Sequence, residues 1–143
     1  VYYKECPAYL QAAIESMLNQ TEAPDEIVLV CDGPLTDEQN LVIGEYLDCL
    51  KVLRLECNKG LGTALAEGIK FCRNEWIARM DSDDISADNK LSRLTSFVRT
   101  SALQWSVYSS FQIENKRSRQ AYTLSFIIST PYKLPMATIA CFS

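Results

Sequence analysis

The sequence predicts an α/β fold in which a mostly parallel β-sheet is flanked by helices. Short runs of strand-forming residues alternate with longer segments whose apolar residues recur every three or four positions. The run at 26–31 is apolar almost throughout, as in a strand buried on both faces. Strands that alternate with helices of this length are joined by right-handed crossovers, which make neighbouring strands parallel. The chain has 143 residues, 48% of them hydrophobic, which is enough for one domain with a core.

The first expected helix covers residues 7–18. Pro7 suits a first helical position, and four apolar residues follow at the spacing of one helix face. A short strand at 26–31 comes next and ends at the turn formers Asp32, Gly33 and Pro34. The four apolar residues of the helix at 7–18 are Leu10, Ile14, Met17 and Leu18.

Two more pairs of helix and strand lead to residue 80. Thr36 and Gln39 resemble a capping box, which places the start of the second helix there, and a strand follows near residues 52–55. The turn at 58–62 begins a third helix, and a strand at 75–80 follows it. The apolar faces are expected to use Leu41, Val42, Tyr46 and Leu47 in the second helix and Leu65, Ile69 and Phe71 in the third.

The last third of the chain has a weaker pattern. A fourth helix is expected at 87–99. Residues 106–113 are compatible with a strand, 115–118 with a polar turn, and 122–129 with either a strand or a helix. The apolar positions of the fourth helix are Leu91, Leu94, Phe97 and Val98.

Charge and cysteine content narrow the class of protein. The net charge is −4, but the charges are unevenly distributed. Residues 1–84 include 16 acidic and 7 basic side chains, whereas residues 85–143 include 2 acidic and 7 basic ones. The basic second half is compatible with a phosphorylated or membrane-bound partner, or with ordinary solvated side chains, and we expect no nucleic-acid partner. Six cysteines without a Cys-x-x-Cys pair, and no histidine, argue against a zinc site. They predict reduced, mostly buried thiols in a cytoplasmic protein.

Three carboxylates crowd into the loop after the strand at 75–80. They belong to Asp81, Asp83 and Asp84. Two ionised carboxylates about 4 Å apart repel by roughly 4 kcal/mol at an effective dielectric of about 20, and a divalent metal ion is the simplest compensation. Ligands of parallel sheets bind where the carboxyl ends of the strands meet at one edge. The loops expected to meet there are 3–5, 32–34, 58–62 and 81–84.

Other interpretations of the acidic loop remain open or fit poorly. The calcium loop of EF-hands needs Glu at its twelfth position, where this chain has Ser92. A phosphatase of the haloacid dehalogenase type also has Asp-x-Asp after a strand, but usually the first strand and with Thr or Val where Ile85 stands. A phosphohydrolase that uses Asp81 therefore remains an alternative. An acidic turn in which Asp84 or Asp88 caps the next helix is the simplest structural interpretation.

The glycine-rich turn does not match a dinucleotide-binding fingerprint. Gly60-Leu61-Gly62 resembles its start, but Leu65 occupies the place of the third glycine and the loop follows a later strand than the motif requires. A dehydrogenase of that kind and a P-loop are therefore excluded. A tight turn without ligand contact is an alternative for this loop, as it is for Asp32-Gly33-Pro34.

Five blocks of sequence, in this order, resemble family 2 glycosyltransferases of the GT-A fold, over about residues 1–98. The resemblance implies a Rossmann-like, mostly parallel sheet. It also implies transfer of a sugar from a nucleoside diphosphate donor to an acceptor hydroxyl, with inversion and with Mg²⁺ or Mn²⁺, in the synthesis of a polysaccharide or cell-surface glycan. The blocks are 3–5, 16–21, 25–34, 58–62 and 78–84.

The resemblance also implies roles for individual residues. Tyr3 and Glu5 would lie near the base and ribose, Asp32 would accept a hydrogen bond from a uracil-like imide, and Lys59 would lie near the donor. Asp81 and Asp83 match the family's Asp-x-Asp pair: one would contact the ribose or sugar, and the other the metal that bridges the two phosphates. Asp84, which directly follows this pair, makes the exact metal ligand ambiguous. The metal would act as a Lewis acid that neutralises the leaving diphosphate.

The chain departs from the family pattern at both ends, so we expect it to be truncated there. Only Val1 to Tyr3 remain of a first strand. Inverting transfer needs a general base, and after Asp84 the only acidic residues, Asp88 and Glu114, lie in no matching motif. The base is therefore expected beyond Ser143.

These observations predict a nucleotide-sugar-binding part at 1–98 and the start of the acceptor side of the same domain at 99–143. The expected donor is a UDP-sugar and the expected acceptor a glycan or a lipid-linked glycan. A cytoplasmic protein, in peripheral contact with the inner face of the membrane, would suit such an acceptor. The rival functions are a non-catalytic nucleotide-sugar-binding fragment and the phosphohydrolase that uses Asp81.

Overall fold

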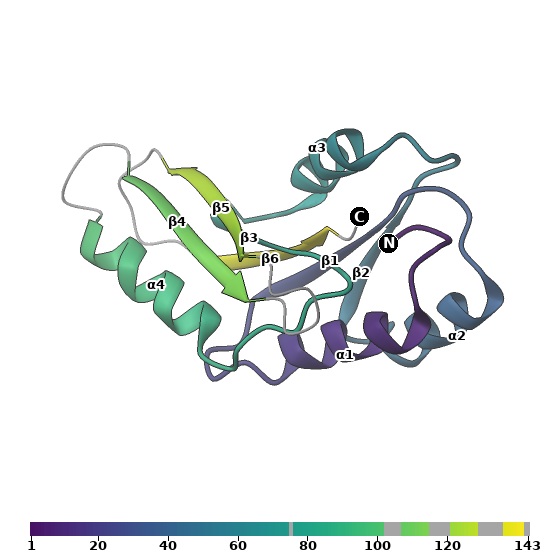
Figure 1. Cartoon of the computed structure of the whole chain (residues 1–143), viewed down its shortest axis with the longest axis horizontal. Coiled ribbons are helices and arrows are strands. Elements are labelled where there is room, and N and C mark those ends of the chain that lie inside the picture. Colours follow the sequence, from purple (N-terminus) through teal and green to yellow (C-terminus); the bar gives the residue numbers. More distant parts are fainter. Residues whose placement is uncertain (75, 102–106, 115–120, 129–135, 142–143) are drawn as a thin grey trace.

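A four-stranded parallel sheet in the order β2-β1-β6-β3 forms the centre of the fold, and strands β4 and β5 pair separately as an antiparallel hairpin (Figure 1). The computed structural model describes residues 1–74, 76–101, 107–114, 121–128 and 136–141, with side chains for 1–74 and 77–96. The strands are β1 (Glu26–Cys31), β2 (Leu50–Arg54), β3 (Trp76–Met80), β4 (Val107–Glu114), β5 (Ala121–Ile128) and β6 (Met136–Cys141). The helices are α1 (Pro7–Leu18), α2 (Asp37–Glu45), α3 (Leu61–Phe71) and α4 (Lys90–Ser101).

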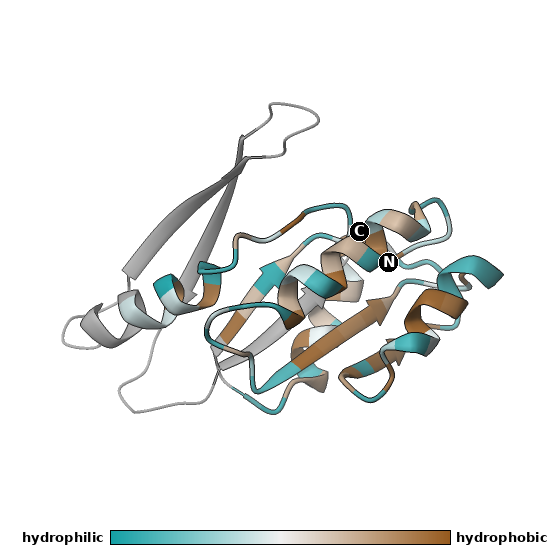
Figure 2. Cartoon of the chain, turned by 90° about the horizontal axis from the view of Figure 1, so that it is seen from below, coloured by the Kyte–Doolittle hydropathy of each residue, from teal (hydrophilic) through white to brown (hydrophobic). Residues whose placement is uncertain are grey.

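Helices cover both faces of the sheet, which confirms the predicted fold class. In Figure 1, α1 and α2 lie below the sheet, α3 lies above it, and α4 lies at the left, below the hairpin of β4 and β5. Strand β1 is buried along its whole length, as predicted. Ile27 and Leu29 pack in the core with α1, whereas Val28 and Val30 pack on the other face against Ala64 of α3. Figure 2 shows many of the hydrophobic residues on the strands and mostly hydrophilic ones on the loops.

Strand β6 is the element that the sequence pattern does not predict. It lies between β1 and β3 and is parallel to both, so a segment from the end of the chain occupies the middle of the sheet. Its pairing with β1 ends at Val30↔Cys141. Beyond that point Val1 lies beside β1: its ammonium group donates to the Val30 carbonyl (2.8 Å) and its carbonyl accepts from Asp32 N–H (2.8 Å). Val1 makes these two contacts, but residues 1–3 form no strand.

Several expected boundaries and faces differ from the structure. Strand β2 begins at Leu50, helix α4 begins at Lys90, and residues 121–128 form a strand. The expected turn at 115–118 and the side chains of Phe97 and Val98 lie outside the described residues.

The expected apolar faces of α2 and α3 are correct only in part: Val42, Tyr46 and Leu65 are half-buried and pack against the core. In α2 the buried residues are Gln39 and Ile43, whereas Leu41 is 71% exposed and Leu47 lies beyond the helix end at Glu45. In α3 the buried residues are Ala64 and Gly68, and Ile69 and Phe71 are exposed. The buried face of α3 therefore consists of small residues, with the half-buried Leu65 packed beside them.

The expectation that most cysteines are buried is also wrong for the described side chains. Of the five that the structure describes, Cys31 is buried in β1 and Cys72 is half-buried, whereas Cys6, Cys49 and Cys57 are exposed. The exposed three all lie outside the helices and strands. These five thiols are free, as expected. No described helix is long and apolar enough to cross a membrane.

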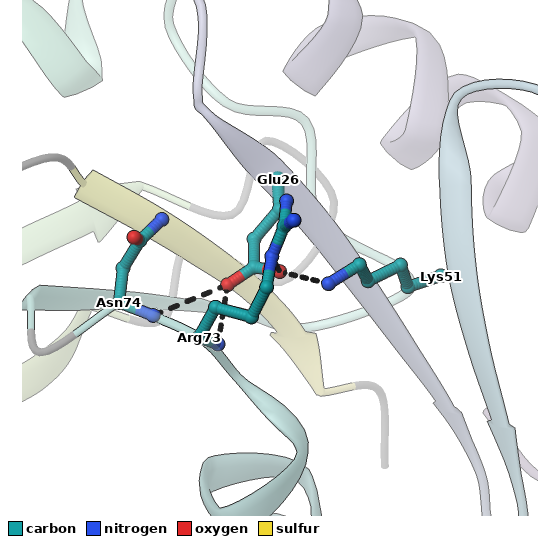
Figure 3. Close-up of polar contacts among 4 residues, drawn as sticks. All are labelled: Glu26, Lys51, Arg73 and Asn74. Atoms are coloured by element: carbon teal, nitrogen blue, oxygen red, sulfur yellow. Dashed lines mark hydrogen bonds and ion pairs between the residues drawn. The ribbon is translucent and has the colours of Figure 1, made fainter.

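A buried carboxylate fastens the amino end of β1, far from the carboxyl edge of the sheet. The Glu26 side chain is 2% exposed. It accepts hydrogen bonds from Lys51 Nζ (2.6 Å) and from the backbone N–H groups of Arg73 (2.7 Å) and Asn74 (3.3 Å), as Figure 3 shows. Burial would raise the pKa of Glu26, but the hydrogen bonds from Lys51 and Arg73 outweigh it and lower the pKa. Glu26 thus joins β2 and the turn after α3 to β1.

Candidate functional site

Loops from four parts of the chain meet at the carboxyl edge of the sheet, as predicted. Two hydrogen-bonded pairs show the meeting: Asp32 accepts from the backbone of Lys59, and Glu5 accepts from Ser82 Oγ (2.7 Å). Val1 connects the two pairs. It directly precedes the Tyr2–Glu5 segment, and its carbonyl accepts a hydrogen bond from Asp32 N–H. Side chains that are 77 residues apart in sequence therefore touch at this edge.

Asp32 holds the glycine-rich turn in place. Its two carboxylate oxygens accept from Lys59 N–H (2.7 Å) and Gly60 N–H (2.9 Å), at the start of α3, where a negative charge is favourable. The side chain is buried, and each oxygen keeps a further lone pair for another donor. Gly33 permits this approach: its φ is +94°, and a Cβ there would lie 2.7 Å from the Asn58 nitrogen.

A buried glutamine positions the segment that carries Tyr3 and Glu5. Gln39 is fully buried, and its amide donates to the Tyr2 carbonyl (2.8 Å) and the Glu5 carbonyl (2.9 Å). The same residue completes the capping box with Thr36, which confirms that prediction. Tyr3 remains 55% exposed, with its ring edge-on to Tyr2 and with Lys4 Nζ 5.5 Å from its ring centroid. Gln39 therefore both caps α2 and holds the backbone on either side of the exposed Tyr3.

The acidic loop places its three carboxylates in different surroundings. Asp81 is half-buried and pairs with Arg79, Asp83 is exposed, and Asp84 is buried. Between them Ser82 is fully buried by its contact with Glu5. These placements leave Asp83 as the member of the set most open to solvent.

The protein supplies its own cations to the acidic loop. Arg79 pairs with Asp81. Lys90, at the start of α4, donates to the Arg79 carbonyl (3.2 Å) and to Ser86 Oγ (3.3 Å), and its charge acts on Asp84 and Asp81. The expectation that a divalent metal ion is the simplest compensation is therefore incomplete, because two basic side chains already offset the repulsion.

The pKa values of three groups show how crowded the charges are. Burial raises the pKa of Asp84, and the neighbouring charges of Asp83 and Asp81 raise it further. Burial likewise raises the pKa of Glu5, against the opposing hydrogen bond from Ser82. Burial lowers the pKa of Lys90 to about 8, although Asp84 and Asp81 favour its charged form. Clustered shifts of this kind are typical of functional sites.

The Asp84→Asn variant is expected to be more stable than the wild-type chain at neutral pH. The raised pKa means that ionised Asp84 is less favourable in the folded than in the unfolded state, and a neutral amide avoids this cost. We expect the melting temperature to rise by about 3 °C at about pH 7. Thermal unfolding followed by circular dichroism measures it, with exposed Asp48→Asn as the control.

The pH dependence gives this prediction a second test. As the pH falls toward the ordinary value of 3.8, the wild-type Asp84 carboxyl takes up a proton earlier in the folded than in the unfolded chain. The advantage of Asp84→Asn should therefore shrink as the pH falls from about 7 to about 4. An advantage that stays constant would show that the carboxylate charge is not its cause.

The oxygen donors of the loop suit a hard cation whose coordination a substrate completes. Among the side chains described, no three His, Cys, Asp or Glu residues group together to hold a metal ion. Mg²⁺ is usually bound by one or two carboxylates together with substrate phosphates and waters, not by a cage of protein ligands. Asp83, which is exposed, and Asp81, which is half-buried, fit that description as the ligands expected from the sequence.

The sequence argument missed the residues that support the site. Gln39 was expected only to cap α2, and Arg79 and Lys90 had no expected role. Gln20 is a fourth supporting residue that was missed. Its amide donates to the Ala87 carbonyl (2.7 Å) and accepts from Leu91 N–H (3.0 Å), and these bonds fix the segment between the acidic loop and α4. Two signals were available for Gln20: its polar type directly after the apolar face of α1, and its place in the block 16–21.

Comparison with known sequences adds evidence of another kind. The sequence model described as "Glycosyl transferase family 2" matches residues 1–140. An uncharacterized glycosyltransferase of Haemophilus influenzae is 40% identical over 100 residues, which cover 68% of this chain and 38% of that protein. The amylovoran biosynthesis glycosyltransferase AmsE of Erwinia amylovora is 37% identical over 102 residues, or 70% and 38%.

A third relative has a substrate in its name. It is the UDP-Gal:alpha-D-GlcNAc-diphosphoundecaprenol beta-1,3-galactosyltransferase of Escherichia coli, 37% identical over 100 residues, which cover 68% of this chain and 36% of the relative. The chain thus spans little more than a third of the length of these curated relatives.

Proposed function

The chain belongs to glycosyl transferase family 2, and on that premise we propose that it forms the donor-binding part of an enzyme that transfers a sugar, with inversion, from a UDP-sugar to an acceptor hydroxyl. The observation that carries the proposal is the meeting of Asp32 with Lys59 and of Glu5 with Ser82 at one edge of the parallel sheet. Ligands of such sheets bind at this edge. The family membership rests on the match over residues 1–140.

In this proposal the base and ribose lie between the Tyr3 and Asp32 loops. The exposed Tyr3 ring offers a face for the base, and a free lone pair of Asp32 accepts from the imide N–H of uracil. The exposed Lys59 lies in the glycine-rich turn that Asp32 holds, and its positive charge would attract the negatively charged diphosphate of the donor. Glu5 meets the acidic loop through Ser82, so its contact with the ribose would be made beside that loop.

Asp83 and Asp81 would hold Mg²⁺ or Mn²⁺ together with the donor phosphates. When bound, the metal supplies Lewis-acid stabilisation to the departing nucleoside diphosphate. Asp83 is the exposed member of the pair and is free to turn toward an incoming cation, whereas Asp81 is drawn back by Arg79. Ser82 fixes the backbone between them.

The acceptor side is proposed from the relatives. The name of the Escherichia coli relative contains a lipid-linked acceptor, a diphosphoundecaprenol, and AmsE is named for amylovoran biosynthesis. We place the acceptor of this protein in the same class, a lipid-linked glycan used in polysaccharide synthesis, and the reaction at the inner face of a membrane. Residues 1–98 would carry the donor side, and residues 99–143 the start of the acceptor side.

Replacement of Tyr3 tests the donor site directly. Stacking of a base on an aromatic side chain is worth about 1–3 kcal/mol, so Tyr3→Ala should weaken UDP binding by about tenfold or more. Displacement of a fluorescent UDP analogue in the presence of Mn²⁺ measures the affinity. Tyr9→Ala is the matched control, because Tyr9 is also an exposed tyrosine but lies on α1. Equal affinities in the two variants would contradict the proposed base position.

The same assay separates the rival functions. UDP should displace the analogue at lower concentration than GDP, because the proposed Asp32 contact matches the uracil imide. A non-catalytic binding fragment would show this selectivity without sugar transfer to any lipid-linked acceptor. A phosphohydrolase would release phosphate from small phosphomonoesters, and that activity, lost in Asp81→Asn, would overturn the proposal.

A further inference from the structure

The ion pair between Arg79 and Asp81 lies at the base of the acidic loop. Arg79 Nη2 donates to Asp81 Oδ1 at 2.5 Å, and the two side chains are 29% and 25% exposed. Side chains alternate along a strand, and the neighbours Ala78 and Met80 are buried in the core with α1. Arg79 therefore leaves β3 on the opposite side from that core and reaches forward to a carboxylate two residues ahead.

Little else among the described residues holds the guanidinium in place. Arg79 Nε is buried and has no acceptor in the described part of the chain. A buried donor without a partner is unfavourable, and an arginine that is fixed for structural reasons normally has its N–H groups satisfied. Lys90 differs, because its ammonium group has two oxygen acceptors, the Arg79 carbonyl and Ser86 Oγ. Attraction to Asp81 is thus the main contact that the structure gives Arg79.

We infer that Arg79 is a displaceable counter-ion: it neutralises Asp81 while no metal is bound, and it withdraws when a divalent cation binds to Asp81 and Asp83. The inference rests on the proposed function, which places the cation there. A divalent ion on Asp81 and the guanidinium on the same carboxylate repel each other, so each weakens the binding of the other. Lys90 keeps its two oxygen contacts and remains as the fixed cation near Asp84.

Mn²⁺ binding in the absence of nucleotide tests the inference. The electron paramagnetic resonance signal of free Mn²⁺ gives the dissociation constant for the wild-type chain and for Arg79→Met. We expect Arg79→Met to bind Mn²⁺ about three- to fivefold more tightly, the upper part of the range that loss of a partly exposed ion pair corresponds to. Arg93→Met removes the same charge from an exposed position on α4 and should change the affinity less than about twofold.

The opposite result has a clear meaning. If Arg79→Met binds Mn²⁺ with equal or lower affinity than the wild-type chain, Arg79 orients Asp81 for the metal, and the inference is wrong while the proposed function stands. If the wild-type chain and the variant both fail to bind Mn²⁺ and also fail to bind UDP, the inference and the proposed function are both wrong. These two failures are therefore distinguishable.

A measurement on the unmodified chain covers the case in which Arg79→Met does not fold. In a uniformly ¹⁵N-labelled chain, the Arg79 Nε–H signal is expected to shift on addition of Mg²⁺ and the Arg93 Nε–H signal to stay in place. An Arg79 signal that does not change while Mg²⁺ shifts the Asp83 backbone amide would overturn the inference.

Discussion

The Glu26→Ala variant is expected to lower the free energy of unfolding by about 3 kcal/mol, because removing one partner of a buried charge network leaves the others without compensation. The side chain is 2% exposed and joins β2 and the turn after α3 to β1 (Figure 3). Without it, Lys51 loses its buried partner, and the N–H groups of Arg73 and Asn74 lose their acceptor. Urea unfolding followed by circular dichroism measures the loss.

Glu67→Ala is the matched control for this prediction. Glu67 also pairs with a lysine, Lys70 at 2.8 Å, but on the surface of α3 with 39% of its side chain exposed. Its loss should cost less than about 1 kcal/mol. Similar losses in the two variants would show that burial of Glu26 does not strengthen its contacts.

The pH dependence of the Glu26 effect follows from its lowered pKa. A carboxyl group whose pKa is lower in the folded state stabilises the fold above the unfolded value, here about 4.5. That contribution is lost as the pH falls through the folded value. The difference between the wild-type chain and Glu26→Ala should therefore be largest near neutral pH and decrease below about pH 4.5.

The Asp83→Asn variant is expected to lose most of the metal-dependent affinity for UDP, by about 30-fold or more, while keeping its stability. Loss of one of two charged metal ligands removes on the order of 2 kcal/mol or more of binding free energy. Because Asp83 is exposed, the amide should not disturb the packing of the loop. Displacement of the fluorescent UDP analogue in Mn²⁺ and thermal unfolding measure the two quantities.

Asp48→Asn removes the same charge from an exposed turn after α2 and should leave UDP affinity unchanged. If Asp83→Asn also leaves metal-dependent binding unchanged, the assignment of Asp83 as a metal ligand is wrong. Loss of UDP binding accompanied by a large fall in melting temperature would point to damage of the loop, not to loss of a ligand.

Local sequence patterns predicted the parts of the fold that depend on nearby residues. The apolar spacing in α1, the continuous apolar run of β1 and the capping box at Thr36 are all complete within about a dozen residues. The acidic loop and the Asp32 turn were also predicted to meet at one edge, because strand direction alone brings the carboxyl ends together.

Features that depend on distant residues could not be predicted in this way. Strand β6 is six residues long and has no pattern to show that it inserts between β1 and β3. The buried face of α3 uses the small residues Ala64 and Gly68, which the spacing of the larger apolar residues does not indicate. The roles of Arg79 and Gln39 arise from contacts with a loop carboxylate and with loop carbonyls, which residue type alone does not reveal.

The central claim, that the carboxyl edge binds a nucleoside diphosphate together with a divalent cation, is tested most directly by isothermal titration calorimetry of the wild-type chain with UDP, once in Mn²⁺ and once in EDTA. We predict binding in Mn²⁺ that disappears in EDTA. Binding of equal strength in both solutions, or no binding in either, would contradict the claim.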